Sequence, residues 1–241
     1  MPATVIIPAR LASSRFPEKV LADDTGRPLV QHVVDRVSQC RRVGRVLVAV
    51  DDDKTARRLA EFDTPCVMTA VDHASGTDRL AEVVRRERIE GVVVNVQADE
   101  PEIDPEVVDG LIGLMESSDA GMATCCCDWP AGERAENPNM VKVVRAADGR
   151  ALYFSRALIP HGRDAPSAPL LHLGIYAYRA QVLLRLSGLP AGALEQIEKL
   201  EQLRALENHI AIDVLHVRHA TPGIDTIEQY RAFVARFALN Q

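Results

Sequence analysis

Three basic side chains lie close together in the segment that follows the first apolar run of the sequence. Residues 8–19 read PARLASSRFPEK, so Arg10, Arg15 and Lys19 bring positive charge among small residues that allow a close backbone approach. In a doubly wound α/β sheet, the loop after the first strand lies at the carboxyl edge, where ligands bind. We expect this loop to hold phosphate groups, with a solvated basic turn as the alternative. The chain contains neither GxGxxG nor GxxxxGK[ST], so the dinucleotide and P-loop fingerprints do not apply.

Two carboxylates, Asp99 and Asp225, each come where an apolar run ends and a new element is expected. Asp99 stands in NVQADEP and Asp225 in PGIDT. Carboxylates at strand ends, together with phosphate oxygens, are suitable ligands for Mg²⁺. For Asp99 the alternative is a turn before Pro101, and for Asp225 it is a helix N-cap.

A third polar segment, HASGTDR at residues 73–79, enters a predicted helix. Ser75, Gly76 and Thr77 offer hydroxyl and backbone N–H groups at a helix N-terminus, which is a ready polar site. A plain helix cap by Ser75 or Thr77 is the simpler interpretation of these residues alone.

Several classes of function are excluded by composition and spacing. Cys125, Cys126 and Cys127 are contiguous, and successive strand residues point to opposite faces, so they cannot converge on one ion and are expected to be buried. The seven His show no zinc-ligand spacing, and there is no GxSxG motif. A net charge of −6 without basic blocks argues against a nucleic-acid partner. No apolar run approaches the roughly 20 residues of a membrane span, and the five Cys do not suggest disulfides. We expect a soluble cytoplasmic protein without membrane insertion.

Apolar β-branched runs alternate with amphipathic helical patterns in the first half of the chain, which predicts an α/β fold with a mostly parallel central sheet. The predicted strands there are Ala3–Pro8, Arg45–Val50, Cys66–Thr69 and Gly91–Val96, and the helices are Pro28–Cys40, a charged helix from Asp51–Asp53, Thr77–Glu87 and Pro105–Met115. After about Ala120, closely spaced strands suggest a smaller mixed part: Met122–Asp128, Met140–Arg145, Ala151–Ser155, Leu173–Tyr178 and Ile210–Val217. Helices are predicted at Arg179–Leu186, Leu194–Asn208 and Thr226–Ala238, and Ile159–Pro169 is expected to be a mobile loop. We interpret residues 1–241 as one domain.

Taken together, eight segments resemble the 3-deoxy-manno-octulosonate (Kdo) cytidylyltransferases, in family order and from residue 5 to residue 226. They are VIIPARLASSRFPEKVL, MTAVDHASGTDRLAEV, VVVNVQADEPEI, NPNMVKVV, ALYFSRALIP, LHLGIYAYR, LEQIEKLEQLRALENH and PGIDT. The resemblance implies a Rossmann-like nucleotidyltransferase fold with a smaller sugar-binding and dimerisation part at about 137–220. It also implies a homodimer and the reaction of CTP with Kdo, a 2-keto sugar acid, to give CMP-Kdo and pyrophosphate with Mg²⁺, for lipopolysaccharide biosynthesis.

The resemblance also implies roles for individual residues. Arg10, Ser13 and Lys19 would hold the triphosphate, with Arg10 and Lys19 acting directly in catalysis beside the metal ligands Asp99 and Asp225. Ser75, Gly76, Thr77 and Arg79 would line the cytidine side, and Gln97 would lie near the base, ribose or sugar. The residues of the sugar pocket would be Arg156, His172, Tyr176, Glu201 and Gln202. Arg156 suits the sugar carboxylate, because a planar guanidinium can grip it with two hydrogen bonds.

Two positions depart from the family pattern: Ala98 replaces the usual Gly of NVQGDEP, and Leu171 stands where relatives often carry Arg or Lys. An Ala at a position with positive φ would cost stability, and one extra methyl could narrow the site. Two alternatives stay open. One is a cytidylyltransferase for a related acidic sugar, such as 8-amino-Kdo or a sialic-acid-like substrate, and the other is a catalytically silent nucleotide-binding protein.

Overall fold

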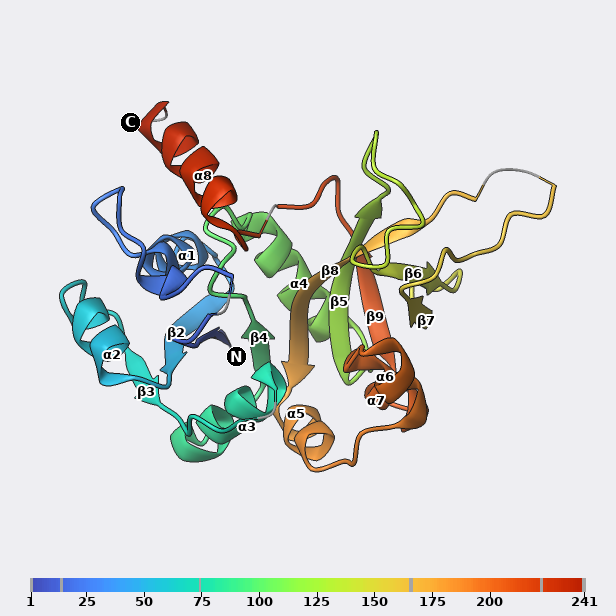
Figure 1. The fold of residues 1–241 in the computed structure, drawn as a ribbon. Coiled ribbons are helices and arrows are strands. Elements are labelled where there is room, and N and C mark those ends of the chain that lie inside the picture. The colour runs from blue at the N-terminus through green and yellow to red at the C-terminus, as the bar shows by residue number, and fades with distance from the viewer. Residues whose placement is uncertain (1, 14, 74, 165–166, 222, 240–241) are drawn as a thin grey trace. The chain divides into compact units, whose positions relative to one another are not determined.

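The structure, a computed structural model, describes residues 2–13, 15–73, 75–164, 167–221 and 223–239. The chain divides into two compact units (Figure 1), one formed by Met1–Asp109 with Thr221–Gln241 and the other by Gly110–Ala220. The predicted sugar-binding part, about 137–220, falls within the second unit, and the interpretation as a single domain stays a prediction.

The first unit is built on four parallel strands in the order β3-β2-β1-β4. They are β1 (Ala3–Ala9), β2 (Val43–Val50), β3 (Cys66–Met68) and β4 (Val92–Asn95). Val5 pairs with Val46 on one side and Val94 on the other. Near-continuous apolar runs suit these strands because both faces of the sheet are covered, and Val5, Ile6 and Ile7 are fully buried. The predicted α/β class with a largely parallel sheet is confirmed.

Helices connect these strands, and the last helix of the chain returns to the same unit. They are the 3-10 helix η1 (Lys19–Leu21), α1 (Leu29–Val37), α2 (Asp53–Ala60), α3 (Gly76–Glu87) and α8 (Ile227–Leu239). The helix α8 lies beside α1 in Figure 1, because Tyr230 and Phe233 share a buried cluster with Leu29 and Ile224. Phe16 packs against this cluster, with its ring centroid 5.4 Å from that of Tyr230. The segment that carries Asp225 is therefore anchored next to the loop after β1.

The second unit is centred on β5 (Met122–Asp128), which pairs antiparallel with β8 (Leu170–Arg179) and parallel with β9 (Ile212–His216). A small ladder of β6 (Lys142–Arg145) and β7 (Ala151–Ser155) joins it through β8. The helices are α5 (Ala180–Ser187), α6 (Ala193–Glu198) and α7 (Gln202–Glu207), while α4 (Pro105–Ser117) contains the boundary between the units. Cys125, Cys126 and Cys127 lie buried in β5 as expected, and burial raises the pKa of the Cys126 thiol to about 11.

The predicted helix Leu194–Asn208 is wrong, because two short helices replace it. Lys199 adopts a left-handed conformation with φ of 54° and ends α6, and α7 begins at Gln202. The reversal lets Glu207 accept a hydrogen bond from the Leu194 backbone N–H at 3.0 Å, and Arg204 form an ion pair with Glu195 at 2.6 Å. These contacts give hydrogen-bond partners to groups in the first turn of α6, which a continuous helix could not provide. The other predicted elements are present with ends shifted by a few residues.

Two further expectations meet the limits of the described residues. Residues 165 and 166 of the predicted mobile loop Ile159–Pro169 lie outside them, as do Ser14, Ala74 and Pro222 of the quoted motifs. None of the described helices combines the length and the apolarity that a membrane crossing requires.

Candidate functional site

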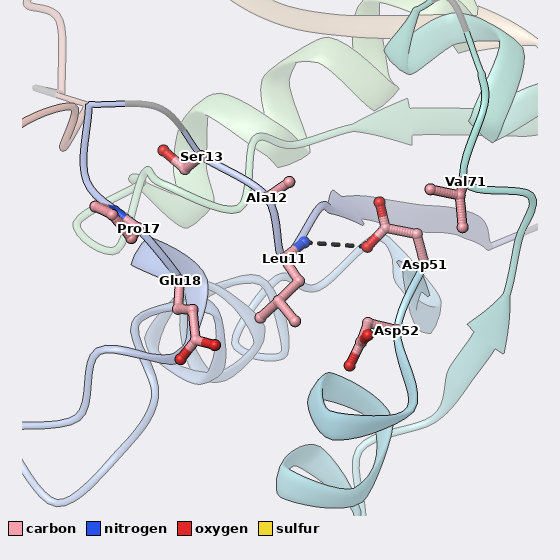
Figure 2. A pocket seen from close by; sticks show the side chains of 8 residues that line it. All are labelled: Leu11, Ala12, Ser13, Pro17, Glu18, Asp51, Asp52 and Val71. Atoms are coloured by element: carbon pink, nitrogen blue, oxygen red, sulfur yellow. Dashed lines mark hydrogen bonds between the residues drawn. The ribbon is translucent and has the colours of Figure 1, made fainter.

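The predicted phosphate loop lies at the carboxyl edge of the first unit's sheet and borders a pocket of about 690 Å³. Its lining comprises Leu11, Ala12, Ser13, Pro17, Glu18, Asp51, Asp52 and Val71. Figure 2 shows Leu11 next to Asp51 and Asp52, and these two carboxylates and Val71 come from the segments after β2 and β3. The Leu11 backbone N–H donates to Asp51 Oδ1 at 3.0 Å, which ties the loop to the end of β2. The sequence did not predict Asp51 as a site residue. The one feature of the sequence that could have indicated it is its position directly after the apolar run of β2.

The acidic side chains of this pocket all have partners within the first unit. Asp51 accepts a hydrogen bond from Arg79 at 3.1 Å, Asp52 caps α2 through the Lys54 backbone N–H, and Glu18 forms an ion pair with Lys54 at 2.6 Å. Arg79 and Lys54 therefore offset part of the negative charge of these carboxylates, which lowers the repulsion that an anionic ligand would meet there.

Arg79 does not lie at the surface where a cytidine-lining role would place it. Its side chain is fully buried and donates to Thr69 Oγ1 at 2.6 Å as well as to Asp51. Burial lowers the pKa of Arg79, and the charge of Asp51 opposes that shift. Arg79 thus connects α3 to the ends of β2 and β3, and the structure gives it a supporting position beneath the pocket.

The two predicted metal ligands converge on one cation. Lys19 Nζ lies 2.6 Å from Asp99 Oδ2 and 3.3 Å from Asp225 Oδ1, and the Lys19 side chain is only 11% exposed. Arg15 reaches Asp225 at 3.0 Å, and the Ile224 backbone N–H donates to the Asp99 carbonyl at 2.8 Å. Lys19, Asp99 and Asp225 therefore lie together, while their roles toward a triphosphate and a metal stay predictions.

This arrangement fits a hard divalent cation that takes two ligands from the protein. Asp99 and Asp225 offer carboxylate oxygens aimed at a single point, and phosphate oxygens and water would complete the coordination of Mg²⁺. Among the described residues, no cluster of three or more His, Cys, Asp or Glu could hold a metal. Next to Asp99, burial and the neighbouring carboxylate raise the pKa of Glu100 to about 8. Glu100 was not singled out from the sequence.

The segment before α3 joins the same edge of the sheet. Arg10 donates to the His73 carbonyl at 2.8 Å, so the first predicted loop and the HASGTDR segment are connected. Ser75 Oγ accepts from the Asp78 backbone N–H at 3.1 Å, which confirms the cap interpretation. A Cβ built on Gly76 would meet no atom within 4 Å, so the backbone there is open to a ligand. Thr77 is buried and Gln97 is half-buried. Ala98 does not have positive φ, so the departure from Gly causes no strain there.

In the second unit, Arg156 is held by backbone carbonyls. Its guanidinium donates to Glu198 O at 2.7 Å, Pro138 O at 2.8 Å and Lys199 O at 3.3 Å. Three of its five N–H groups are thereby used, and no described residue accepts from the other two, which could bind a carboxylate. The sequence did not single out Lys142, which is fully buried in the structure. Its ammonium group donates to the Arg156 and Asn137 carbonyls.

The other predicted sugar-side residues of this unit form an aromatic row. The ring centroid of His172 lies 5.0 Å from that of Phe154 and 5.5 Å from that of Tyr176, so the His172 and Tyr176 rings lie side by side on β8. Burial lowers the pKa of His172 to about 3, so the imidazole is neutral. Burial also raises the pKa of Tyr176 well above its usual value, with smaller effects of Tyr178 and Glu201. Gln202, buried at the start of α7, follows Glu201.

Comparison with known proteins gives consistent results. The family model described as Cytidylyltransferase matches residues 4–212. A 3-deoxy-manno-octulosonate cytidylyltransferase of Rhodopirellula baltica is 44% identical over 98% of both chains, and one of Nitratidesulfovibrio vulgaris strain DP4 is 47% identical over 92% of this chain and 91% of its own.

Solved structures agree with these relatives. A CMP:2-keto-3-deoxy-manno-octonic acid synthetase complexed with CTP has a TM-score of 0.94, 41% identity and full coverage of both chains. A cytidylyltransferase of Leptospira borgpetersenii, 15% identical, matches with a TM-score of 0.64 over 99% of this chain and 87% of its own, and so shares the fold. The predicted Rossmann-like nucleotidyltransferase fold is confirmed.

Proposed function

Because the chain belongs to the 3-deoxy-manno-octulosonate cytidylyltransferase family, we propose that it activates Kdo with CTP, giving CMP-Kdo and pyrophosphate. It is a nucleotidyltransferase. The observation that carries this function is the convergence of Asp99, Asp225 and Lys19 at the carboxyl edge of the sheet, next to the loop of residues 8–19. Two carboxylates and a cation beside a phosphate loop suit the handling of a triphosphate and its metal.

In the reaction, the anomeric hydroxyl oxygen of the sugar forms a bond to the α-phosphorus of CTP while the bond to the pyrophosphate oxygen breaks. The hydroxyl proton leaves to solvent or a basic oxygen. Such transfer depends on positioning and on neutralising charge rather than on a covalent protein nucleophile. Arg10, Ser13 and Lys19 bind the triphosphate oxygens in this proposal. Mg²⁺ held by Asp99 and Asp225 would supply further neutralisation of the phosphate charge when bound.

The nucleotide and the sugar are bound by two sets of residues in this proposal, which have Gln97 in common. Ser75, Gly76, Thr77 and Gln97 face the cytidine side in this proposal, and Arg79 supports them from beneath. For the sugar acid, the two remaining N–H groups of Arg156 bind the carboxylate, and His172, Tyr176, Glu201 and Gln202 bind hydroxyl groups. The neutral imidazole and the protonated phenol support this assignment, because each can exchange hydrogen bonds with a hydroxyl without carrying a charge.

The test is pyrophosphate release from CTP with a panel of 2-keto sugar acids. We expect turnover with Kdo to exceed that with 8-amino-Kdo and with a sialic acid. Faster turnover of either analogue than of Kdo would show that the analogue, and not Kdo, is the preferred substrate. Absence of pyrophosphate with every acid, in the presence of CTP binding, would establish a silent nucleotide-binding protein.

The family resemblance also supports a homodimer that works in the cytoplasm. Light scattering of the purified enzyme tests the homodimer: a mass near twice the 26.4 kDa of the chain is expected, and a mass near that of one chain would contradict it.

A further inference from the structure

Thr124 occupies an irregular place in the sheet of the second unit. In the antiparallel ladder of β5 and β8, Thr124 pairs with Tyr176, but the next residue, Cys125, pairs with Leu173. Residues 174 and 175 of β8 are therefore extra, as in a β-bulge. The bulge brings two backbone carbonyls to the fully buried Thr124 hydroxyl, from Leu173 at 3.1 Å and from Ile175 at 2.8 Å.

The same hydroxyl is also in contact with the ring of His172, whose Nε2 lies 3.0 Å from Thr124 Oγ1. Three neighbours thus surround one hydroxyl, which carries a single hydrogen. Carbonyl oxygens can only accept. If the hydroxyl donated to Nε2, both carbonyls would face an oxygen with no hydrogen between them. If the hydroxyl donates to a carbonyl, Nε2 must carry a hydrogen and donate to Oγ1. This second arrangement forms two hydrogen bonds where the first forms one.

We propose that Thr124 is a positioning residue that holds His172 in the Nε2–H tautomer, so that Nδ1 accepts a hydrogen bond from a hydroxyl of the sugar acid. The tautomer follows from the contacts of Thr124, while the role of Nδ1 rests on the proposed function. Nothing assigned so far to the sugar site involves Thr124, which lies on β5 and not in the motifs that suggested the site.

Two observations support this direction of the hydrogen bonds. The imidazole is neutral, since burial lowers its pKa to about 3, so only one ring nitrogen carries a hydrogen. Its ring is also fixed in orientation, edge-on to buried Phe154 at an interplanar angle of 78° and next to Tyr176. No residue that the structure describes forms a hydrogen bond with Nδ1, which is therefore available to a ligand.

The tautomer is measured directly by long-range ¹⁵N–¹H correlation NMR of the protein labelled at histidine nitrogen, with His172→Gln identifying the signals. We expect His172 of the wild-type protein to be protonated at Nε2 alone, and Thr124→Ser to keep this pattern because the hydroxyl is retained. Thr124→Val is nearly isosteric but removes the acceptor for Nε2–H, so a population protonated at Nδ1 should appear. A wild-type spectrum with the hydrogen on Nδ1, or a tautomer unchanged in Thr124→Val, would overturn the proposal.

Kinetics then test the role of Nδ1. In Thr124→Val the KM for the sugar acid should rise by roughly fivefold to tenfold, the effect of one weakened hydrogen bond, while the KM for CTP stays within about twofold. Thr124→Ser should restore the wild-type KM. The matched control is Thr55→Val in the first unit, because the buried Thr55 hydroxyl has no hydrogen-bond partner among the described residues. It should change neither the spectrum nor either KM.

The two parts of the proposal fail separately. An altered tautomer in Thr124→Val with an unchanged KM for the sugar would overturn the role of Nδ1. Absence of turnover with any sugar acid in the wild-type protein would instead overturn the proposed function, and the NMR result on the tautomer would stand. Thermal melts of each variant show whether it is folded, and if Thr124→Val is not, the tautomer in the wild-type spectrum still decides the proposal.

Discussion

At the scale of single residues, the most informative contact is that of Lys19 with Asp99 and Asp225. The ammonium group lies within 3.3 Å of both carboxylates, so each carboxylate is held in a position from which it could bind a cation. Because Lys19 is nearly buried, its attraction to the two carboxylates is screened less by water than that of an exposed ion pair.

Asp99→Asn and Asp225→Asn should each reduce kcat by roughly a hundredfold or more, since neutralisation of the phosphate charge supplies several kcal/mol in such reactions. The measurement is pyrophosphate release at saturating CTP and Kdo over a range of Mg²⁺ concentrations. Asp213→Asn, at a carboxylate of β9 that pairs with Arg150 instead, is the matched control and should keep nearly full activity. Full activity of either site variant at ordinary Mg²⁺ would show that the carboxylate is not a metal ligand.

A second residue-scale prediction concerns Arg156. Arg156→Lys keeps the charge but loses the planar fork, so kcat/KM for the sugar acid should fall tenfold or more, at roughly 1.4 kcal/mol per decade. CTP affinity should change little, and two titrations, one with each substrate, compare these effects.

The control for Arg156→Lys is Arg150→Lys, since Arg150 is a partly exposed arginine of the same unit that pairs with Asp119. It should leave both titrations unchanged. A loss confined to CTP in Arg156→Lys would remove Arg156 from the sugar site. An equal loss of thermal stability in the two variants would show that the carbonyl contacts of Arg156 contribute little to folding.

At the scale of elements, the start of α3 combines a structural and a proposed functional role. Ser75 caps this helix, and the neighbouring Gly76 leaves open space beside the backbone. A helix N-terminus with free N–H groups favours an anion, but a cap also stabilises the helix without any ligand. Only a change that keeps the cap and alters the charge separates the two roles.

Ser75→Asp is such a change, because Asp is an equally good N-cap but adds a negative charge. We expect stability to stay within about 0.5 kcal/mol of the wild type, while the KM for CTP rises by roughly tenfold; Ser75→Ala should cost about 1 kcal/mol of stability. Thermal melts and CTP titrations measure both. Asp104→Ala removes the carboxylate that accepts from the Glu106 backbone N–H near the start of α4, and should lower stability without affecting CTP. An unchanged KM for CTP in Ser75→Asp would leave Ser75 as a cap alone.

At the scale of the whole molecule, the stability of the fold should depend on pH through His172. Burial lowers its pKa to about 3 in the folded protein, against 6.5 for an unperturbed histidine. As the pH falls below about 6.5 the unfolded chain binds a proton that the folded protein does not, so stability is lost between pH 6.5 and 3. At pH 5 the stability lost through His172 is on the order of 2 kcal/mol, and the partial exposure of the ring makes this loss smaller.

The corresponding measurement is denaturant unfolding of the wild type and of His172→Gln at pH 7.5 and pH 5. The loss of stability between these pH values should be smaller in His172→Gln by on the order of 1 kcal/mol. The exposed His161 provides the control, and His161→Gln should show the wild-type loss. Equal losses in all three proteins would mean that His172 is protonated as easily in the folded protein as in the unfolded chain.

The local character of the chain could be predicted from the sequence alone. Strand β1, the basic loop after it and the cap at Ser75 are encoded by neighbouring residues, through apolar runs, charge and capping chemistry. The order of eight motifs along the chain was enough to identify the family, and so the reaction. Such patterns are readable because they depend on contacts between residues a few positions apart.

What only the tertiary structure decided were the partners of these side chains. Lys19 meets Asp99 across 80 residues and Asp225 across 206, and Thr124 meets His172 across 48 through a bulge that no local pattern announces. Likewise, the periodic run 194–208 is compatible with one helix, and it is divided because Glu207 and Arg204 satisfy groups at the start of α6. Periodicity specifies which face of an element is apolar, whereas packing between distant segments determines which polar groups are buried together and where their hydrogens go.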